Sequence, residues 1–168
     1  MYQQELIELS RAGVRYLVIG AVALGLSGYP RATLDLDLFV DLSEENLDRL
    51  LRVLGQMGYK PRAPVDSAQL KDPEERRKWI QDKHAKVFAF HQTKKPLSQI
   101  DVLLESPVSF PEAWKRSRVV LVGGEEVRVA CPEDLLALKQ FAAREKDRGD
   151  IEVLKKIIQL ERWKKTRS

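Results

Sequence analysis

Two aspartates, Asp35 and Asp37, stand two positions apart in the stretch RATLDLDLFVD, residues 31–41. The leucines that alternate with them predict a strand with one apolar face. Residues two apart on a strand point the same way, so the two carboxyls can converge on one point above the sheet. Two carboxylates held together repel each other unless a cation lies between them, and Mg²⁺ prefers oxygen ligands. The spacing therefore predicts a metal site that suits phosphoryl chemistry.

A third aspartate, Asp101, lies in a second predicted strand between Ile100 and Val102, which point the other way. If this strand pairs beside the first, Asp101 can be a third metal ligand or the base that takes a proton from an attacking hydroxyl. An Asp-x-Asp pattern alone is more often the solvated face of a half-exposed strand. Aspartate is disfavoured in strands, however, and three such positions favour the functional interpretation.

Gly20 closes an apolar stretch that is typical of a short buried strand, and a helix is expected to follow it. Glycine lets a backbone approach a ligand closely, and the amides at the start of a helix favour anions. The turn at Gly20 and Ala21 therefore suits a triphosphate. The alternative is that Gly20 merely permits a tight turn, but its position relative to the acids favours a phosphate site.

The elements that must position these residues follow from periodicity and from turn residues. We expect helices over residues 5–13, 21–28, 43–59, 132–146 and 150–163, and strands over residues 14–20, 34–40, 85–92 and 98–105. The last two strands should form a hairpin, and a second hairpin is expected around Gly123 and Gly124. Ser43 is expected to cap its helix, with Asn46 at the position of a capping-box acid. The elements predict an α/β (α+β) protein.

Length and composition limit the number of domains and the class of protein. The 168 residues, with Lys+Arg 29 and Asp+Glu 25, suit one domain with a mild basic bias. The single cysteine excludes an internal disulfide and indicates a cytoplasmic protein. No stretch approaches the roughly 20 apolar residues that span a bilayer, so no membrane partner is expected. Residues 60–95 contain ten basic and five acidic residues, which suits RNA phosphates or a solvated face. We expect the tryptophans, Trp79, Trp114 and Trp163, to pack in the core or between helices.

These features together resemble the signature of the nucleotidyltransferase superfamily, which has the DNA polymerase beta-like fold. In VIGAVALGLSGYPRATLDLDLFV, a strand and a glycine precede a helix and then an Asp-x-Asp strand. The pattern is closest to the branch of the AbiEii and AbiGii abortive-infection toxins. The later stretch PEDLLALKQFAAREKDRGDIEVL resembles the last motif of that branch, a helix with a lysine, then an arginine, then Lys-Asp and a further aspartate. The resemblance covers residues 14–160.

The resemblance implies a role for each matching position. Asp35, Asp37 and Asp101 match catalytic carboxylates that hold Mg²⁺ or Mn²⁺. The positions that match nucleotide-binding residues are Gly20, Ala21, Arg31, Thr33, Lys139 and Arg144. Ala21 departs from the pattern, because a second glycine or serine is usual there, and its methyl replaces a hydroxyl contact while the backbone N–H remains.

The late motif also has a simpler interpretation. Lys146, Asp147 and Asp150 match its remaining positions, yet charges near helix ends also stabilise those ends. Lys139 is different, because leucines and Phe141 surround it in the sequence and a lysine in an apolar helix needs an anion nearby.

The reaction that the resemblance implies is transfer of a nucleoside monophosphate from a nucleoside triphosphate, such as ATP, to an acceptor hydroxyl. The implied fold is a small mixed β-sheet flanked by helices, with a catalytic core over residues 1–130 and a C-terminal helical pair over residues 131–168. The acceptor would be an RNA or tRNA end or a protein side chain, as for a toxin of a toxin-antitoxin or phage-defence system with a cognate antitoxin. Two alternatives stay open, a small-molecule acceptor such as an antibiotic, and an inactive binding or antitoxin-like partner.

Overall fold

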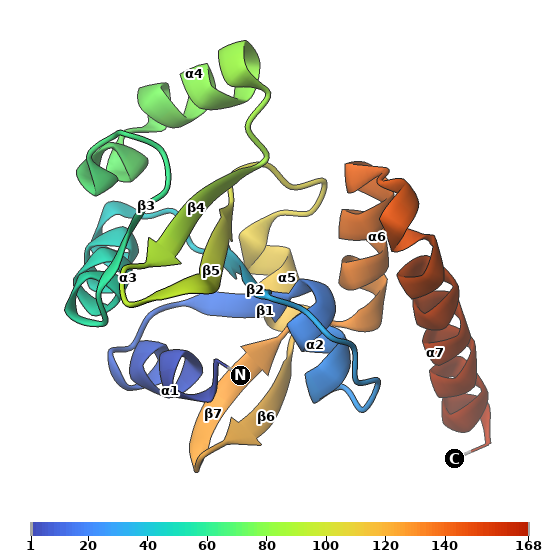
Figure 1. Cartoon of the computed structure of the whole chain (residues 1–168). Helices are drawn as coiled ribbons and strands as arrows, with labels where there is room; N and C mark the ends of the chain where they lie inside the picture. Colours follow the sequence, from blue (N-terminus) through green and yellow to red (C-terminus); the bar gives the residue numbers. More distant parts are fainter. Residues whose placement is uncertain (1, 168) are drawn as a thin grey trace.

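Figure 1 shows the computed structural model, which describes residues 2–167. Within these residues the strands form one sheet in the order β3-β4-β5-β2-β1-β7-β6. They are β1 (Tyr16–Ile19), β2 (Asp35–Val40), β3 (Tyr59–Pro61), β4 (Val87–Gln92), β5 (Lys95–Leu103), β6 (Arg118–Val122) and β7 (Glu125–Val129). The pairs β2/β5 and β1/β7 are parallel and the other pairs are antiparallel. The expected mixed sheet and both expected hairpins are confirmed.

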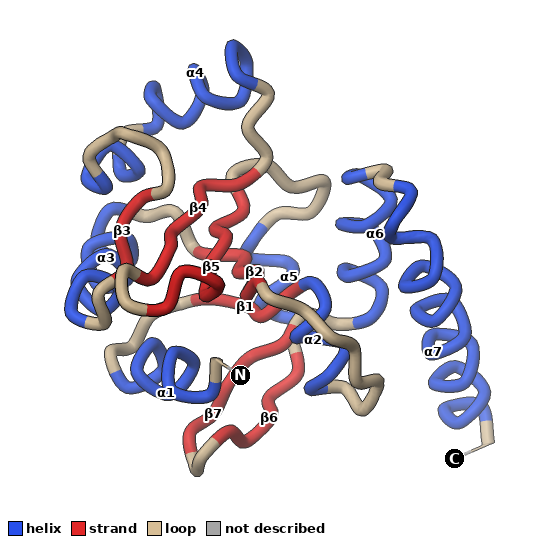
Figure 2. Tube along the Cα trace, viewed as in Figure 1, coloured by secondary structure: helices blue, strands red, loops and turns tan. Residues whose placement is uncertain are grey.

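Helices flank the sheet, and the last two pack against each other at one end of the molecule (Figures 1 and 2). They are α1 (Gln3–Arg11), α2 (Gly20–Leu26), α3 (Glu44–Gln56), α4 (Pro73–Lys83), α5 (Phe110–Arg116), α6 (Pro132–Ala142) and α7 (Arg148–Thr166). The α/β fold with a C-terminal helical pair is therefore confirmed. The division of the chain at residue 130 stays a prediction. No helix among residues 2–167 is both long and apolar enough to cross a membrane.

The alternation of β2 separates its two faces as expected. Leu36 and Leu38 are fully buried in the core, while Asp35 and Asp37 lie on the other face and are only partly buried. On β5, Ile100 and Val102 are likewise fully buried. Burying these four aliphatic side chains fixes the register, because a slip of one residue would place the carboxylates in the core.

Three elements were not expected from the sequence, namely β3, α4 and α5. Helix α4 begins where the Asp72 side chain accepts a hydrogen bond from the Glu74 backbone N–H at 2.8 Å, with Pro73 in the first turn. Such a cap and an N-terminal proline favour a helix even when the apolar periodicity is weak. Charged residues dominate this helix, so its apolar periodicity was too weak to predict a helix from the sequence.

Three expectations about single side chains were wrong. Ser43 precedes α3 but makes no side-chain capping hydrogen bond. Asn46 is instead buried, accepts a hydrogen bond from the Arg15 N–H at 2.7 Å and donates to the carbonyls of Arg15 and Asp41. Asn46 therefore ties the start of α3 to the segments beside β1 and β2. Trp163 does not pack in the core, because it is 53 % exposed near the end of α7.

Candidate active site

The predicted carboxylates lie on neighbouring strands. In the parallel pairing of β2 with β5, Asp37 stands directly opposite Asp101, and Asp35 stands opposite Gln99. Asp37 and Asp101 line one cavity of about 110 Å³, whereas Asp35 lines an adjoining, more open hollow of about 740 Å³. The structure thus brings the three aspartates to one face of the sheet, with Asp35 on the side of the second hollow.

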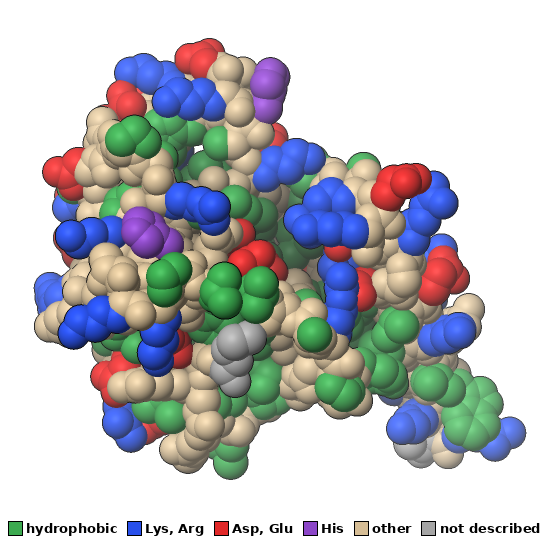
Figure 3. All heavy atoms as spheres, viewed as in Figure 1, with side chains coloured by type: hydrophobic (Ala, Val, Ile, Leu, Met, Phe, Trp, Pro, Cys, Tyr) green, Lys and Arg blue, Asp and Glu red, His purple; other side chains and the backbone are tan. Residues whose placement is uncertain are grey.

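The cavity lies between the sheet and the C-terminal helices. Its polar lining includes Asp37, Lys86, Asp101, Lys139 and Arg144. Figure 3 shows acidic side chains at the floor of a hollow in this face, with Lys and Arg side chains around it. Carboxylates surrounded by cations are an arrangement that suits a bound metal ion together with a phosphate group.

Asp37 and Asp101 have perturbed pKa values. Burial raises the pKa of Asp37, and the negative charge of Asp35 raises it further. Burial and then the charge of Asp37 raise the pKa of Asp101 to about 6. A cation between the carboxylates would oppose both shifts, because it would favour the charged form of each carboxyl and offset the repulsion between them.

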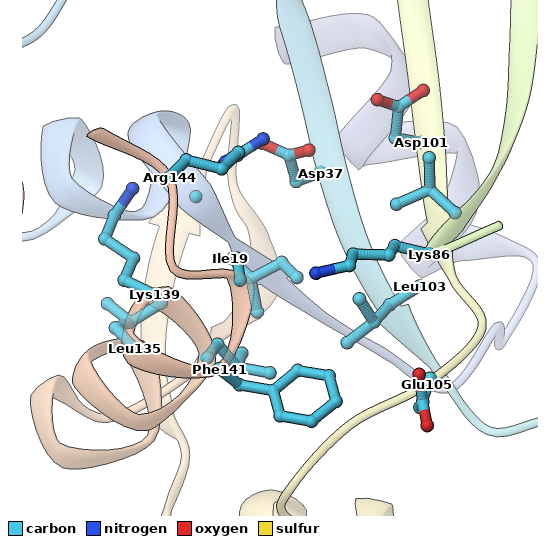
Figure 4. A pocket seen from close by; sticks show the side chains of 14 residues that line it. Ile19, Asp37, Lys86, Asp101, Leu103, Glu105, Leu135, Lys139, Phe141 and Arg144 are labelled. Atoms are coloured by element: carbon cyan, nitrogen blue, oxygen red, sulfur yellow. The ribbon is translucent and has the colours of Figure 1, made fainter. Parts of the chain in front are cut away.

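A divalent ion fits this donor set chemically, because all three side chains offer oxygen ligands on adjacent strand positions. The carboxyls do not converge as they stand. In Figure 4 the carboxyl of Asp37 lies near Arg144, and that of Asp101 points away from it. Within residues 2–167, no three His, Cys, Asp or Glu side chains are grouped so that they could hold a metal ion. The side chain of Asp101 is held by Gln99, whose Nε2 donates to Asp101 Oδ1 at 2.9 Å.

Gly20 is required where it stands. Its φ is +68°, a conformation that side chains disfavour, and a Cβ there would lie 2.1 Å from Asp37 Oδ2. Gly20 begins α2 directly after β1, where Ile19 pairs with Asp37 across the antiparallel strands. Because glycine has no side chain, the Asp37 carboxylate can lie directly against the Gly20 backbone. Gly20 lines the cavity and Ala21 lines the hollow beside Asp35.

Arg31 and Thr33 lie in the segment before β2 and line the hollow with Asp35. The Asp35 N–H donates to Thr33 Oγ1 at 3.2 Å, so the threonine supports the start of the strand. Arg31 donates to the Asp150 carboxylate at the beginning of α7. Thr33 thus supports the start of β2, and Arg31 connects the segment before β2 with α7.

Lys139 has two carboxylate partners within the protein. Its Nζ lies 3.0 Å from Asp147 Oδ1 and 2.7 Å from Asp150 Oδ2. Arg144 Nε also pairs with Asp147, at 2.7 Å from Oδ2. Together with Arg31 these residues form a charge network of three cations and two carboxylates, Arg31–Asp150–Lys139–Asp147–Arg144.

The centre of this network is buried, because the side chains of Lys139, Asp147 and Asp150 are 8 %, 2 % and 10 % exposed. The anion that the sequence predicted near Lys139 is therefore supplied by the late motif. One positive charge remains in excess, three cations against two carboxylates, and Lys139 and Arg144 both line the cavity. The network fixes both cations beside Asp37, where an anionic ligand could still bind.

Sequence reasoning missed three polar residues of this site, Lys86, Gln99 and Glu105. Lys86 lies just before β4, and its place in the cavity depends on the pairing of β4 with β5. Gln99 contacts both Asp101 and Arg62, whose Nη1 donates to Gln99 Oε1. The only signal for Gln99 was its position two residues before Asp101 on the same strand face.

Comparison with known proteins gives one family and several similar folds. A family described as "Nucleotidyltransferase of unknown function (DUF6036)" matches residues 2–166. The lincomycin-bound lincosamide antibiotic adenylyltransferase LnuA is 14 % identical, with a TM-score of 0.59 over 90 % of this chain and 92 % of that chain. The enzyme ANT(2")-Ia, in complex with adenylyl-2"-tobramycin, is 12 % identical, with a TM-score of 0.57 over 95 % of this chain and 91 % of that chain.

A third structure, an antigenic nucleotidyltransferase-like protein from Paracoccidioides brasiliensis, is 18 % identical, with a TM-score of 0.53 over 94 % of this chain and 73 % of that chain. At these identities the likeness shows the fold. No curated protein sequence matches the chain.

Proposed function

The chain belongs to the nucleotidyltransferase family that matches residues 2–166, and from this premise we propose that it transfers a nucleoside monophosphate from a nucleoside triphosphate to an acceptor hydroxyl. One observation carries the proposal. Asp37 and Asp101 face one cavity from opposite positions of adjacent strands, and Lys139 and Arg144 line the same cavity. Carboxylates and cations at one point suit a reaction in which negative charge passes between phosphates.

Asp35, Asp37 and Asp101 would hold Mg²⁺ or Mn²⁺, which when bound neutralises charge on the triphosphate. The Gly20 turn, Lys139 and Arg144 would hold the phosphates. Arg31, Thr33 and Ala21 would border the same nucleotide from the second hollow.

In the proposed reaction the acceptor oxygen attacks the α-phosphorus and its proton passes to Asp101. The bond from that phosphorus to the bridging oxygen breaks, and pyrophosphate leaves with the electron pair. The charge network would keep Lys139 and Arg144 in place while the charge moves, so that little reorganisation is needed.

The acceptor would be an RNA or tRNA end, or a protein side chain. Basic side chains in residues 60–95, among them Arg62, Lys83 and Lys86, border the carboxylate cavity and a neighbouring apolar pocket of about 360 Å³. These charges favour an anionic acceptor over a cationic one. A role as the toxin of a toxin-antitoxin or phage-defence pair, with the narrower likeness to the AbiEii branch, is part of this proposal.

A small-molecule acceptor is the second candidate, because two proteins of similar fold carry antibiotic substrates or products in their structures, lincomycin and adenylyl-2"-tobramycin. The two candidates differ in charge. Tobramycin-like amines are cationic and would be repelled by Arg62, Lys83 and Lys86, whereas RNA phosphates would be attracted.

The proposal is tested by isothermal titration of the purified protein with each nucleoside triphosphate, with and without Mg²⁺. The double variant Asp35→Asn/Asp37→Asn should lose metal-dependent binding. Asp41→Asn is the matched control, because Asp41 follows the same strand but pairs with Arg15 at 3.0 Å. Metal-independent binding, or equal binding by the double variant, would contradict the catalytic assignment. Transfer of labelled nucleotide to RNA, to protein or to tobramycin then distinguishes the acceptors.

A further inference from the structure

The cavity that contains Asp37 and Asp101 has two unlike ends (Figure 4). Asp37, Asp101 and Arg144 lie at one end. At the other end lie the apolar side chains of Leu103 and Phe141, with the carboxylate of Glu105 beside Leu103. A cavity with two aspartates and Arg144 at one end and an aromatic ring at the other fits a ligand that is divided in the same way, as a nucleoside triphosphate is into phosphates and base.

Phe141 is the largest apolar side chain at its end of the cavity. It lies in the last turn of α6 and is 41 % exposed although it lines the cavity. A single exposed apolar side chain on an open surface is ordinary. An aromatic ring that is exposed toward a cavity is different, because a planar ligand there would cover it and gain the free energy of removing its surface from water.

Lys86 lies between the two ends. Its Nζ is 5.8 Å from the centroid of the Phe141 ring, and its side chain extends across the cavity in Figure 4. Among residues 2–167 its ammonium has no carboxylate partner, in contrast to Lys139 with its two aspartates. The charge of Lys86 is therefore available to a ligand that lies against Phe141 and reaches toward Asp37.

We propose that the Phe141 end of the cavity is the nucleobase subsite, in which the base stacks on the Phe141 ring and Lys86 lies beside the sugar and phosphates. The inference rests on the proposed function, because it places the base of the same nucleoside triphosphate. Every base has a π-face, so stacking on one phenylalanine binds purines and pyrimidines alike. The subsite therefore contributes affinity for nucleotides in general and requires no hydrogen bond to a base edge.

The test compares a ligand with a base and a ligand without one. Titrations of MgATP and of magnesium tripolyphosphate are made with the wild type and with Phe141→Ala, Phe141→Tyr and Trp163→Ala. Phe141→Ala should weaken MgATP binding by about 5- to 150-fold, because stacking on an aromatic side chain has about that effect per base. Tripolyphosphate binding should not change, since it lacks the base. Phe141→Tyr keeps the ring and should keep the affinity for MgATP.

Trp163→Ala is the matched control, because Trp163 is also an exposed aromatic on a C-terminal helix but its ring lies 4.3 Å from the Arg167 guanidinium carbon, and it does not line this cavity. It should leave both titrations unchanged. The proposal is overturned if Phe141→Ala leaves MgATP binding unchanged, or if it weakens both ligands equally, which would indicate a structural role.

The two proposals fail differently. A wild type that binds neither ligand would contradict the proposed function and the subsite with it. A wild type that binds both ligands with equal affinity would retain the phosphate site and refute the base subsite alone.

Discussion

Replacing Lys139 with methionine should test whether the charge network holds the C-terminal helices to the core. The ammonium of Lys139 lies 3.0 Å from Asp147 and 2.7 Å from Asp150, and all three side chains are nearly inaccessible to water. Removing Lys139 takes one cationic partner from each of the two buried carboxylates, and breaking a buried ion pair in this way costs about 3–5 kcal/mol. For a chain of this length that loss lowers the midpoint of thermal unfolding by about 6–20 °C.

Unfolding of nucleotide-free protein in guanidinium chloride measures the loss directly. The free energy of unfolding follows from the midpoint and from the slope of its dependence on denaturant concentration, and both are compared between the variants. Lys155→Met is the control, because Lys155 pairs with Glu152 on the surface of the same α7 and its loss should cost about 0–1 kcal/mol. The double variant Lys139→Met/Asp150→Asn should lose less than the sum of the two single losses, because Lys139 and Asp150 contact each other and each single change breaks the same pair.

The reasoning is refuted if Lys139→Met lowers the free energy of unfolding by less than about 1 kcal/mol, no more than the surface control. That result would mean that Arg31 and Arg144 satisfy the two carboxylates without Lys139. The role of the Lys139 ammonium would then be to bind a ligand and not to stabilise the fold.

Two further predictions concern Gly20 and Asp147. Gly20→Ala should destabilise the protein by about 2 kcal/mol or more through strain at positive φ and the contact with Asp37. Gly25→Ala in the same helix, where a Cβ would meet nothing within 4 Å, should be neutral or stabilising by thermal unfolding; equal losses would disprove the steric argument. Although burial acts to raise the pKa of Asp147, hydrogen bonds from its two cationic partners outweigh it and hold the pKa below its usual value. Its stabilisation should be full above about pH 4 and be lost as the pH falls further, so Asp147→Asn should show a smaller acid-induced loss in denaturant titrations than the wild type; an equal loss would contradict this.

The placement of the carboxylates could be predicted because it depends on a strict period of two. Alternation in β2 assigned Asp35 and Asp37 to one face, and the similar pattern around Asp101 indicated a second strand of the same kind. The pairing of these two strands stayed open in the sequence, because the predicted hairpin joins β4 with β5, and only the structure shows that β5 also pairs with β2. The family match confirms the nucleotidyltransferase superfamily, while the branch within it and the role of each site residue stay predictions.

Long-range charge pairing could not be predicted. Sequence periodicity identified an anion requirement at Lys139 but gave no means to choose between a ligand and the carboxylates of Asp147 and Asp150. The side-chain conformations at the site could not be predicted either. The hydrogen bond from Gln99 to the Asp101 carboxyl depends on the rotamers of both side chains, which the sequence does not determine. Lys86 was missed because a lysine before a strand is common, and only the packing of α6 gives it a cavity.

The pairing of Arg31 with Asp150 joins residues 119 positions apart. During synthesis the sheet strands β1, β2 and β5 can leave the ribosome and begin to pair long before α7 exists. The cavity that contains Asp37 and Asp101 cannot close until α6 has been translated. A nascent chain that already has its three aspartates in place would therefore still lack the wall that supplies Lys139 and Arg144, so under the proposed function its competence for catalysis would arrive with the C-terminal helices rather than with the sheet.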